Sequence, residues 1–261
     1  MNKITAILYK EWLEFKQDRT LVISTLLPPV LLTLMPIGVT YLIGRFPDED
    51  TSELGAVLAD PSLAGLSAEA LGQAVIGKQF GVLFMMMPLF IPSIIAAYSI
   101  VGEKTRRTLE PILATPIRIW ELLLAKSLAA LIPAILITWL CAAIFTGAIA
   151  AVALDQQVFL AIISPGWILL ILLCAPLLSL LAVAAAVMVS SRVNDPRTAQ
   201  QLSAIVIVPI LALFLGQLFG LLVLNPSFVL GVAVILALLT TLAIWFAIKV
   251  FQREVILTHW K

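Results

Sequence analysis

The sequence predicts an all-α, polytopic membrane protein with six transmembrane helices. Of its 261 residues, 62% are hydrophobic and only 12% are charged, whereas an average soluble domain carries about 25% charged residues. Five stretches contain no charged residue: 20–44, 79–102, 127–154, 156–191 and 198–248. Each is long enough to cross a bilayer, which needs about 20 apolar residues. The composition therefore excludes a soluble globular protein and a disordered chain.

The first three charge-free stretches predict one helix each, over 20–44, 79–102 and 127–154. The fifth stretch has 51 residues, and as one helix it would exceed the thickness of two hydrocarbon cores of about 30 Å each. It contains Asn225-Pro226-Ser227, which is a turn signal. This stretch therefore predicts two helices, over 198–218 and 228–248.

The fourth stretch is ambiguous in length, and its Ser164-Pro165-Gly166 break allows one pass or two. The positive-inside rule separates the two readings. One pass, over 167–191, places 14 basic residues inside and two outside, whereas two passes give nine and seven. The sequence thus predicts six helices, both termini in the cytoplasm, an outer loop over 45–78 and Trp167 at the outer interface.

Residues 1–19 predict an N-terminal amphipathic helix that lies on the inner membrane surface. Ile4, Leu8, Trp12 and Phe15 fall at helical spacing on one face, and seven charged residues interrupt the segment. The alternative is a cytosolic extension of the first transmembrane helix.

The predicted spans contain no Asp, Glu, Lys, Arg or His, and the single histidine of the chain is His259. An ion-coupled carrier usually keeps such groups in the membrane. We therefore expect no metal site, no catalytic residue and no cofactor in this chain, so that energy for transport has to come from a partner. Gly72 to Lys78 fits the start of a phosphate-binding loop, but Gln79 replaces the required hydroxyl. We interpret it as the polar entrance to the second helix. No basic stripe beyond the topology signal points to nucleic acid.

The most specific segment is 103–118, between the second and third predicted helices, together with residues 119–126. It resembles the signature of type-2 ABC exporter permeases, E-x-x-x-x-T-L-E-x-L-L-x-T-P followed by E-x-x-x-x-K. The matching residues are Glu103, Thr108, Leu109, Glu110, Leu113, Thr115, Pro116, Glu121 and Lys126. The chain departs from this pattern at Arg107 and Ile112. The resemblance extends over essentially the whole chain and makes 20–261 a permease transmembrane domain.

This resemblance implies that 103–118 is a cytosolic coupling helix that docks on a separate ABC ATPase subunit, which carries the ATP and Mg. It also implies a transporter of two permeases and two ATPases in a prokaryotic cell membrane. The expected coupling residues are Glu103, Arg106, Arg107, Thr108, Leu109, Glu110 and Leu113, and the expected second ATPase contact is Lys10, Glu11 and Glu14.

Other interpretations of these residues stay open. Arg106 and Arg107 could serve only to retain the loop in the cytosol and to bind lipid headgroups. Glu103 and Glu110 could equally form internal salt bridges.

The resemblance also implies a pathway between two permease copies. The candidate pathway or dimer-interface residues are Pro29, Thr33, Gln200, Gln201, Gly216, Gln217 and Gly220. Since this lining is apolar with few polar points, we expect an apolar or amphiphilic cargo such as a lipid, drug or antibiotic. Residues 219–228 could form a re-entrant hairpin. The alternatives to an exporter subunit are an ion-coupled secondary carrier and a non-transporting membrane scaffold or sensor.

Overall fold

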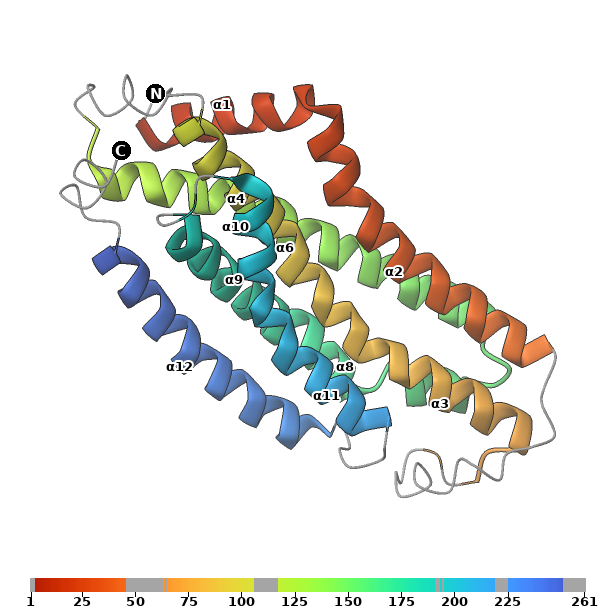
Figure 1. Cartoon of the computed structure of the whole chain (residues 1–261). Coiled ribbons are helices and arrows are strands. Elements are labelled where there is room, and N and C mark those ends of the chain that lie inside the picture. Colours follow the sequence, from red (N-terminus) through yellow and green to blue (C-terminus); the bar gives the residue numbers. More distant parts are fainter. Residues whose placement is uncertain are drawn as a thin grey trace.

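The computed structural model describes residues 3–45, 63, 65–105, 117–190, 193, 195–218 and 225–250. Within these ranges the regular elements are helices and no strand occurs. Six helices are long and apolar enough to cross a membrane. The predicted fold class, an all-helical protein with six such helices, is therefore confirmed. Figure 1 shows them as an elongated bundle, with α1 lying across one end, which we call the α1 end.

The first span is α2 (Arg19–Arg45), and it follows the short helix α1 (Lys3–Gln17) after a sharp bend. Asp18 makes this bend, because its carboxylate accepts a hydrogen bond from the Leu21 amide at 3.0 Å and thereby caps α2. The helix predicted within 1–19 thus exists as a separate element. It packs mainly on α6 and to a smaller extent on α2.

The second span consists of α3 (Ala68–Leu83), the 3₁₀ turn η3 (Phe84–Met86) and α4 (Met87–Thr105). Ser67 caps it, accepting a hydrogen bond from the Ala70 amide. The helix therefore begins well before residue 79, and the predicted outer loop over 45–78 is too long at its C-terminal end. The sequence argument stopped at Lys78 because a charge ended the stretch. The 3₁₀ turn η3 lies just before Pro88. Proline lacks the amide proton that the regular α-helical hydrogen bond requires.

The third and fourth spans follow at 117–190. The third is α6 (Ile119–Val152), and the fourth comprises α8 (Pro165–Leu169), the π-turn η4 (Leu170–Cys174) and α9 (Ala175–Ser190). Before α8 lies the short helix α7 (Gln156–Ile162). The stretch 156–191 thus contains one crossing preceded by a short helix, as the charge count favoured. The π-turn lies just before Pro176, again a proline that interrupts the regular bonding pattern.

The fifth span is α10 (Pro196–Ser203), the 3₁₀ turn η5 (Ala204–Ile207) and α11 (Val208–Leu218), and the sixth is α12 (Pro226–Val250). Asp195 caps α10 by accepting hydrogen bonds from the amide and hydroxyl of Thr198, both at 2.8 Å. The sixth helix begins slightly before the predicted residue 228. The proposed hairpin over 219–228 lies largely outside the described residues.

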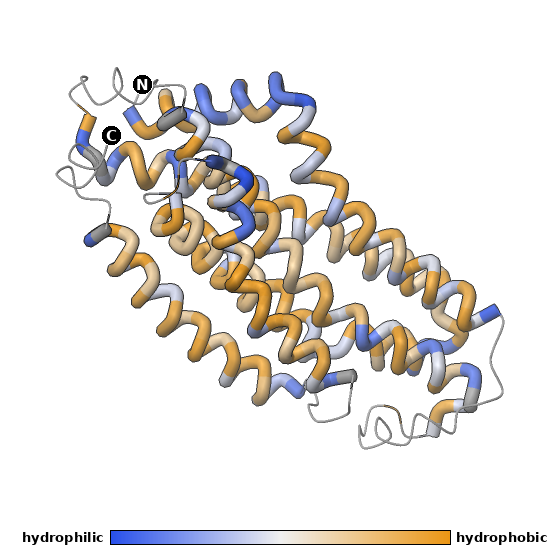
Figure 2. Tube along the Cα trace, in the orientation of Figure 1, coloured by the Kyte–Doolittle hydropathy of each residue, from blue (hydrophilic) through white to orange (hydrophobic). Residues whose placement is uncertain are grey.

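Hydropathy follows the bundle axis. Figure 2 shows apolar residues along the middle of the long helices and hydrophilic residues gathered near their ends. Large apolar side chains such as Leu31 and Leu34 on α2 and Leu238 and Ile248 on α12 are exposed. A wide apolar outer surface of this kind is suited to contact with lipid or with another membrane subunit.

The second span is the central element of the bundle. It packs against α2, α6, α9 and α10, and 78% of its most apolar window is buried, against 22% for the first and fifth spans. Since neighbours surround the second span on several sides, a movement applied at either of its ends reaches most of the bundle.

A buried glutamine ties three helices together at the end of the bundle opposite α1. Gln73 on α3 donates to the carbonyls of Thr40 on α2 and Val152 on α6, at 3.0 and 3.1 Å, and accepts from the amide of Leu154 at 3.0 Å. Gly44 leaves room for this amide, since a Cβ there would lie 2.6 Å from Gln73 Nε2. The segment from Gly72 to Lys78 therefore lies within helix α3 and does not form a phosphate-binding loop.

Trp167 lies inside the bundle and not at the outer lipid interface where the sequence placed it. Its ring packs on Phe84 and Phe145, with centroids 6.2 and 5.9 Å away, and only 6% of the residue is exposed. Gly81 of α3 permits this packing, because a Cβ at that position would lie 2.7 Å from the Trp167 ring.

Gly81→Ala is expected to destabilise the protein by about 1–3 kcal/mol, the usual cost of overpacking a filled interior. The rigid indole has to move, so the Trp167 fluorescence should shift in a variant that keeps this tryptophan alone. Gly147→Ala is the matched control, because nothing lies within 4 Å of a Cβ there. Equal thermal stability of the two variants would contradict the packing role of Gly81.

Candidate functional site

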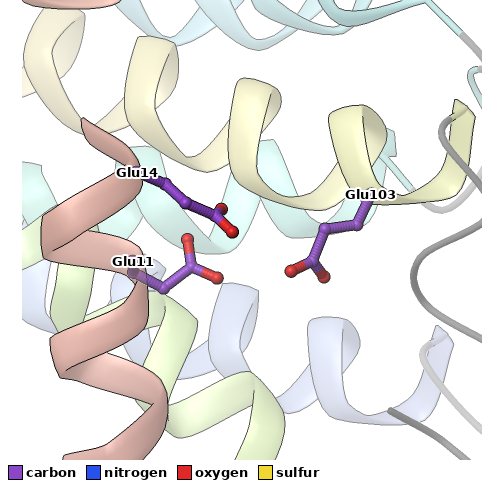
Figure 3. Close-up of side chains that lie close together, drawn as sticks. All are labelled: Glu11, Glu14 and Glu103. Carbon is purple, nitrogen blue, oxygen red and sulfur yellow. The ribbon is translucent and has the colours of Figure 1, made fainter. Parts of the chain in front are cut away.

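Five ionisable side chains from three helices meet at the α1 end. Lys10, Glu11 and Glu14 come from α1, Glu103 from the last turns of α4, and Lys126 from the start of α6. Figure 3 shows the three carboxylates pointing toward one another across the gap between α1 and α4. We call these five residues the ion cluster. It joins the N-terminal helix to both helices that flank the segment 106–116.

Lys126 is the centre of the ion cluster. Its ammonium lies 2.6 Å from Glu11 Oε1 and 2.8 Å from Glu103 Oε2, and it donates to Ser99 Oγ at 2.9 Å. Its hydrogen-bond acceptors are Glu11 Oε1, the Ser99 hydroxyl and the Ser99 carbonyl at 3.2 Å, which match the three donor protons of an ammonium group. Ser99 in turn donates to Glu11 Oε2 at 2.7 Å. The Lys126 side chain is only 3% exposed, so each of these contacts is shielded from water.

Lys10 closes the ion cluster from its outer side. Its ammonium forms an ion pair with Glu103 and lies 3.2 Å from Glu14 and 3.9 Å from Glu11. The Glu11 and Glu103 side chains are each 7% exposed, whereas Lys10 and Glu14 reach solvent. The cluster therefore has a dry core of Glu11, Glu103 and Lys126 and a wet rim of Lys10 and Glu14.

Burial and the neighbouring charges act in opposite directions on the pKa values of Glu11 and Lys10. Desolvation favours the neutral form of Glu11, but the nearby Lys126 charge and the hydrogen bonds from Lys126 and Ser99 outweigh it and lower the pKa of this carboxyl. Desolvation likewise works against the charge on Lys10, yet the hydrogen bond and charge of Glu103 raise the pKa of its ammonium. Both groups are therefore ionised at neutral pH.

The stability of the purified protein is expected to be nearly constant between about pH 6 and 9. Since the Glu11 pKa is lowered, its contribution is present above the ordinary value of 4.5 and is lost as pH falls through the lowered value. Since the Lys10 pKa is raised, its contribution is present below 10.5 and is lost as pH rises through the raised value. Thermal unfolding in mild detergent measures both limits. A continuous change of Tm across the neutral range would contradict this assignment.

The three carboxylates could also be considered as metal ligands, because Glu11, Glu14 and Glu103 each offer an oxygen within 4.8 Å of the others. However, two ammonium groups already lie among them, Lys126 at 2.6 Å from Glu11 and Lys10 at 3.2 Å from Glu14. A divalent cation at this position would be repelled by both ammonium groups. The geometry favours an ion-pair network over a metal centre.

The roles of Lys126 and Ser99 were not predicted. In the sequence Lys126 is part of the signature and Lys10 and Glu11 belong to the expected second ATPase contact, with no indication that these residues meet. The available signal was the position of Glu103 and Lys126, which directly border charge-free stretches. Charges at these places either reach solvent or pair with each other.

This geometry bears on two of the expected ATPase contacts. Glu11 and Glu103 are buried in the core of the ion cluster, and Glu103 forms internal salt bridges with Lys10 and Lys126. A role of either residue in an ATPase contact stays a prediction. Lys10 and Glu14 on the rim remain accessible. The other expected coupling residues lie outside the described part of the chain: Arg106, Arg107, Thr108, Leu109, Glu110 and Leu113.

Glu121 of the signature has a local structural role. Its carboxylate accepts a hydrogen bond from the Arg118 amide at 2.8 Å, which caps the first turn of α6. The signature thus contains one residue that starts α6 and another, Lys126, that ties α6 to the neighbouring helices.

Two of the expected pathway residues line a pocket of about 440 Å³ between the second and fifth spans. Gln200 and Gln201 of α10 form one wall, and Ser93 of α4 lies on the opposite one. The described residues that line it are Phe90, Ser93, Tyr98, Arg197, Gln200, Gln201, Ala204 and Ile207. The structure therefore brings Gln200 and Gln201 together with the second span, as expected for a pathway, and adds Arg197 and Tyr98 to the candidate residues.

Pro29 and Thr33 lie elsewhere. Both are on the buried face of α2, and the Thr33 hydroxyl donates to the Pro29 carbonyl at 2.7 Å. In this structure both residues serve the packing of α2 into the bundle, and their place in a pathway or dimer interface stays a prediction.

Gln217 and Gly216 lie at the far end of α11, where it meets α3. Gln217 donates to the Lys78 carbonyl at 3.3 Å, and Gln79 donates back to the Phe214 carbonyl at 3.2 Å. This reciprocal pair holds the fifth span against the second at the end opposite the ion cluster. Gly220, the other half of the expected GxxxG pair, lies outside the described residues.

Six helices are apolar and long enough to cross a membrane, and these spans define a multi-pass membrane protein. The chain belongs to the ABC-2 family of transporter proteins, since the family model described as "ABC-2 family transporter protein" matches residues 5–244. It is accordingly an ABC-type permease, a transmembrane component that is not itself catalytic. No curated protein matches the chain closely enough to be reported beside it.

Proposed function

We propose that this chain is the membrane-spanning subunit of an ABC exporter, that it works as a dimer, and that a separate cytosolic ATPase drives it. The α1 end then faces the cytoplasm, and the segment 103–118 makes the main ATPase contact. The observation that carries this proposal is the ion cluster, which joins α1, α4 and α6 at the place where that segment leaves the membrane.

The ion cluster supports a mechanical role. A force applied to the segment 106–116 acts on the last turn of α4 and the first turn of α6. Because Glu11 pairs with Lys126 of α6 in the dry core, and Lys10 pairs with Glu103 of α4 at the rim, α1 has to move with both helices or break these two ion pairs, the first of which is buried. Breaking a buried pair is costly. ATPase closure would thus move three helices as one body and not bend a single loop.

The remaining structure fits the same proposal. The moving body includes α4, which forms one wall of the 440 Å³ pocket, while the glutamine pair holds the far ends of α3 and α11 together. A displacement of α4 relative to α10 changes the pocket first, and the far contact has to open for release. We infer an apolar or amphiphilic cargo, because apolar side chains dominate both the outer faces and the interior.

Transport in proteoliposomes tests the proposal. The permease is reconstituted with the ATPase that copurifies with it, and release of an amphiphilic fluorescent dye is followed after ATP addition. We expect release that requires ATP and both subunits. Dye movement driven by an ion gradient without ATP would favour a secondary carrier, and ATP hydrolysis without any dye movement would favour a scaffold or sensor. Either result would overturn the proposal.

A further inference from the structure

The pocket between α4 and α10 is lined partly by apolar and partly by polar side chains. Phe90, Ala204 and Ile207 provide apolar surface, while Arg197 and the amides of Gln200 and Gln201 provide donors. Its volume of about 440 Å³ falls in the usual range of small-molecule sites, about 300–1,000 Å³. No acidic side chain is among the described residues that line it.

Arg197 supplies the only formal charge among these described lining residues. Within the described part of the chain, no carboxylate lies within ion-pair distance of its guanidinium. Asp195, two residues before Arg197, caps α10 and accepts two hydrogen bonds from Thr198. The negative charge of Asp195 reduces the positive potential at Arg197, but Asp195 does not form an ion pair with the N–H groups of the guanidinium. A guanidinium in this position is suited to bind a carboxylate or phosphate through two parallel hydrogen bonds.

The outer face beside the pocket is apolar. Leu202, Ile205 and Val208 on the same span are exposed, Ile205 to 72%, and they lie within the stretch that is apolar enough to cross a membrane. A ligand whose apolar part dissolves in the bilayer can therefore approach the pocket along the membrane, with its head at the level of Arg197.

From this combination we propose that the pocket binds an anionic amphiphile: a carboxylate or phosphate head held by Arg197 with Gln200 and Gln201, and an apolar body against Phe90 and Ile207. This inference rests on the proposed function and names its substrate class. The two sources of such a ligand are an anionic membrane lipid and a free amphiphilic acid, and both share the oxyanion that Arg197 recognises.

Binding is measured on the permease alone in phosphatidylcholine nanodiscs, with 11-(dansylamino)undecanoic acid as the probe and its uncharged methyl ester as the matched ligand. We expect the acid to bind more tightly than the ester. Arg197→Gln is expected to weaken acid binding about 10-fold while ester binding stays nearly unchanged, and Arg197→Lys is expected to keep part of the preference. Ile207→Trp fills the pocket and should weaken both ligands.

Lys249→Gln is the matched control, since this cation lies at the α1 end of α12 over the Trp245 ring and does not line the pocket. Adding phosphatidylglycerol separates the two sources: competition with the probe indicates a lipid headgroup, and its absence indicates a free acid, each in agreement with the proposal. Equal affinities for acid and ester, or an Arg197→Gln variant that binds like the wild type, would overturn it.

A second copy of the chain is the competing occupant of this groove. Gln201→Cys, in a background with both buried native cysteines replaced by alanine, tests this by disulfide formation between copies. Crosslinking that the probe does not reduce would show that the groove is covered by a second permease, and the proposal would fail. Because these measurements need no ATPase, failure of ligand binding and failure of ATPase assembly can be read separately.

Discussion

Replacing Lys126 by alanine is expected to destabilise the protein by about 3–5 kcal/mol, the cost of leaving buried charges without a partner. The substitution removes the ammonium that lies 2.6 Å from Glu11 and 2.8 Å from Glu103 and leaves both carboxylates in a dry core. Thermal unfolding in mild detergent should show the loss, and cysteine pairs placed between α1 and α6 should crosslink less specifically.

A compensated variant separates the lost attraction from the unpaired charge. Glu11→Gln and Glu103→Gln combined with Lys126→Met removes the charges of the core together, and we expect it to recover most of the stability that Lys126→Ala loses, because neutral replacements of buried ion pairs are often tolerated. Lys249→Ala, which removes an exposed cation, is the control for net charge. A Lys126→Ala variant as stable as Lys249→Ala would show that the ion cluster does not hold the three helices together.

The compensated variant also tests the mechanical role of the ion cluster. If the buried pairs transmit force from the segment 106–116, the compensated variant should fold and bind the ATPase but couple ATP hydrolysis to transport less efficiently. Normal coupling in this stable variant would assign the cluster to folding alone.

Replacing Leu109 and Glu110 together by alanine is expected to reduce ATP-driven transport at least about tenfold, with normal membrane insertion and continued ATP hydrolysis by the partner. A tenfold loss corresponds to about 1.4 kcal/mol of coupling free energy. The two residues belong to the signature segment that we propose as the ATPase contact, and neither is needed for an apolar span. The measurement is the number of cargo molecules released per ATP hydrolysed in proteoliposomes.

The matched control for this variant is a double substitution in the same segment, Lys104→Ala with Ile112→Ala. It removes a charged and an apolar residue, as the test variant does, but at positions that are not among the expected coupling residues. Unchanged transport by the Leu109 and Glu110 variant would contradict the coupling assignment, and equal losses in both double variants would assign the effect to the loop as a whole.

The sequence predicted the number of spans and their approximate places because charge-free length is a direct physical requirement of the bilayer. It misplaced the start of the second span because Lys78 was taken as a boundary, although a helix can carry a lysine near its end. It also placed Trp167 at the lipid interface, since it could not know that Gly81 opens space for the ring.

The site was predicted less well than the fold, for a similar reason. Which charges face inward depends on the rotation of α1, α4 and α6 about their axes and on the contacts between them. Lys10, Glu103 and Lys126 are far apart in the sequence, and the packing of α6 against both α1 and α4 brings them together. Gln200 and Gln201, which the sequence offered as pathway or dimer-interface residues, line the pocket between α4 and α10, and their part in a pathway stays a prediction.

The most direct test of the central claim is purification of the tagged chain from its native membrane in mild detergent, with identification of its partners and an ATPase assay. The account predicts recovery of a nucleotide-binding subunit in roughly equal amount and ATP hydrolysis by the complex. Recovery of the chain alone, without ATP hydrolysis, under conditions that preserve known membrane complexes, would contradict it.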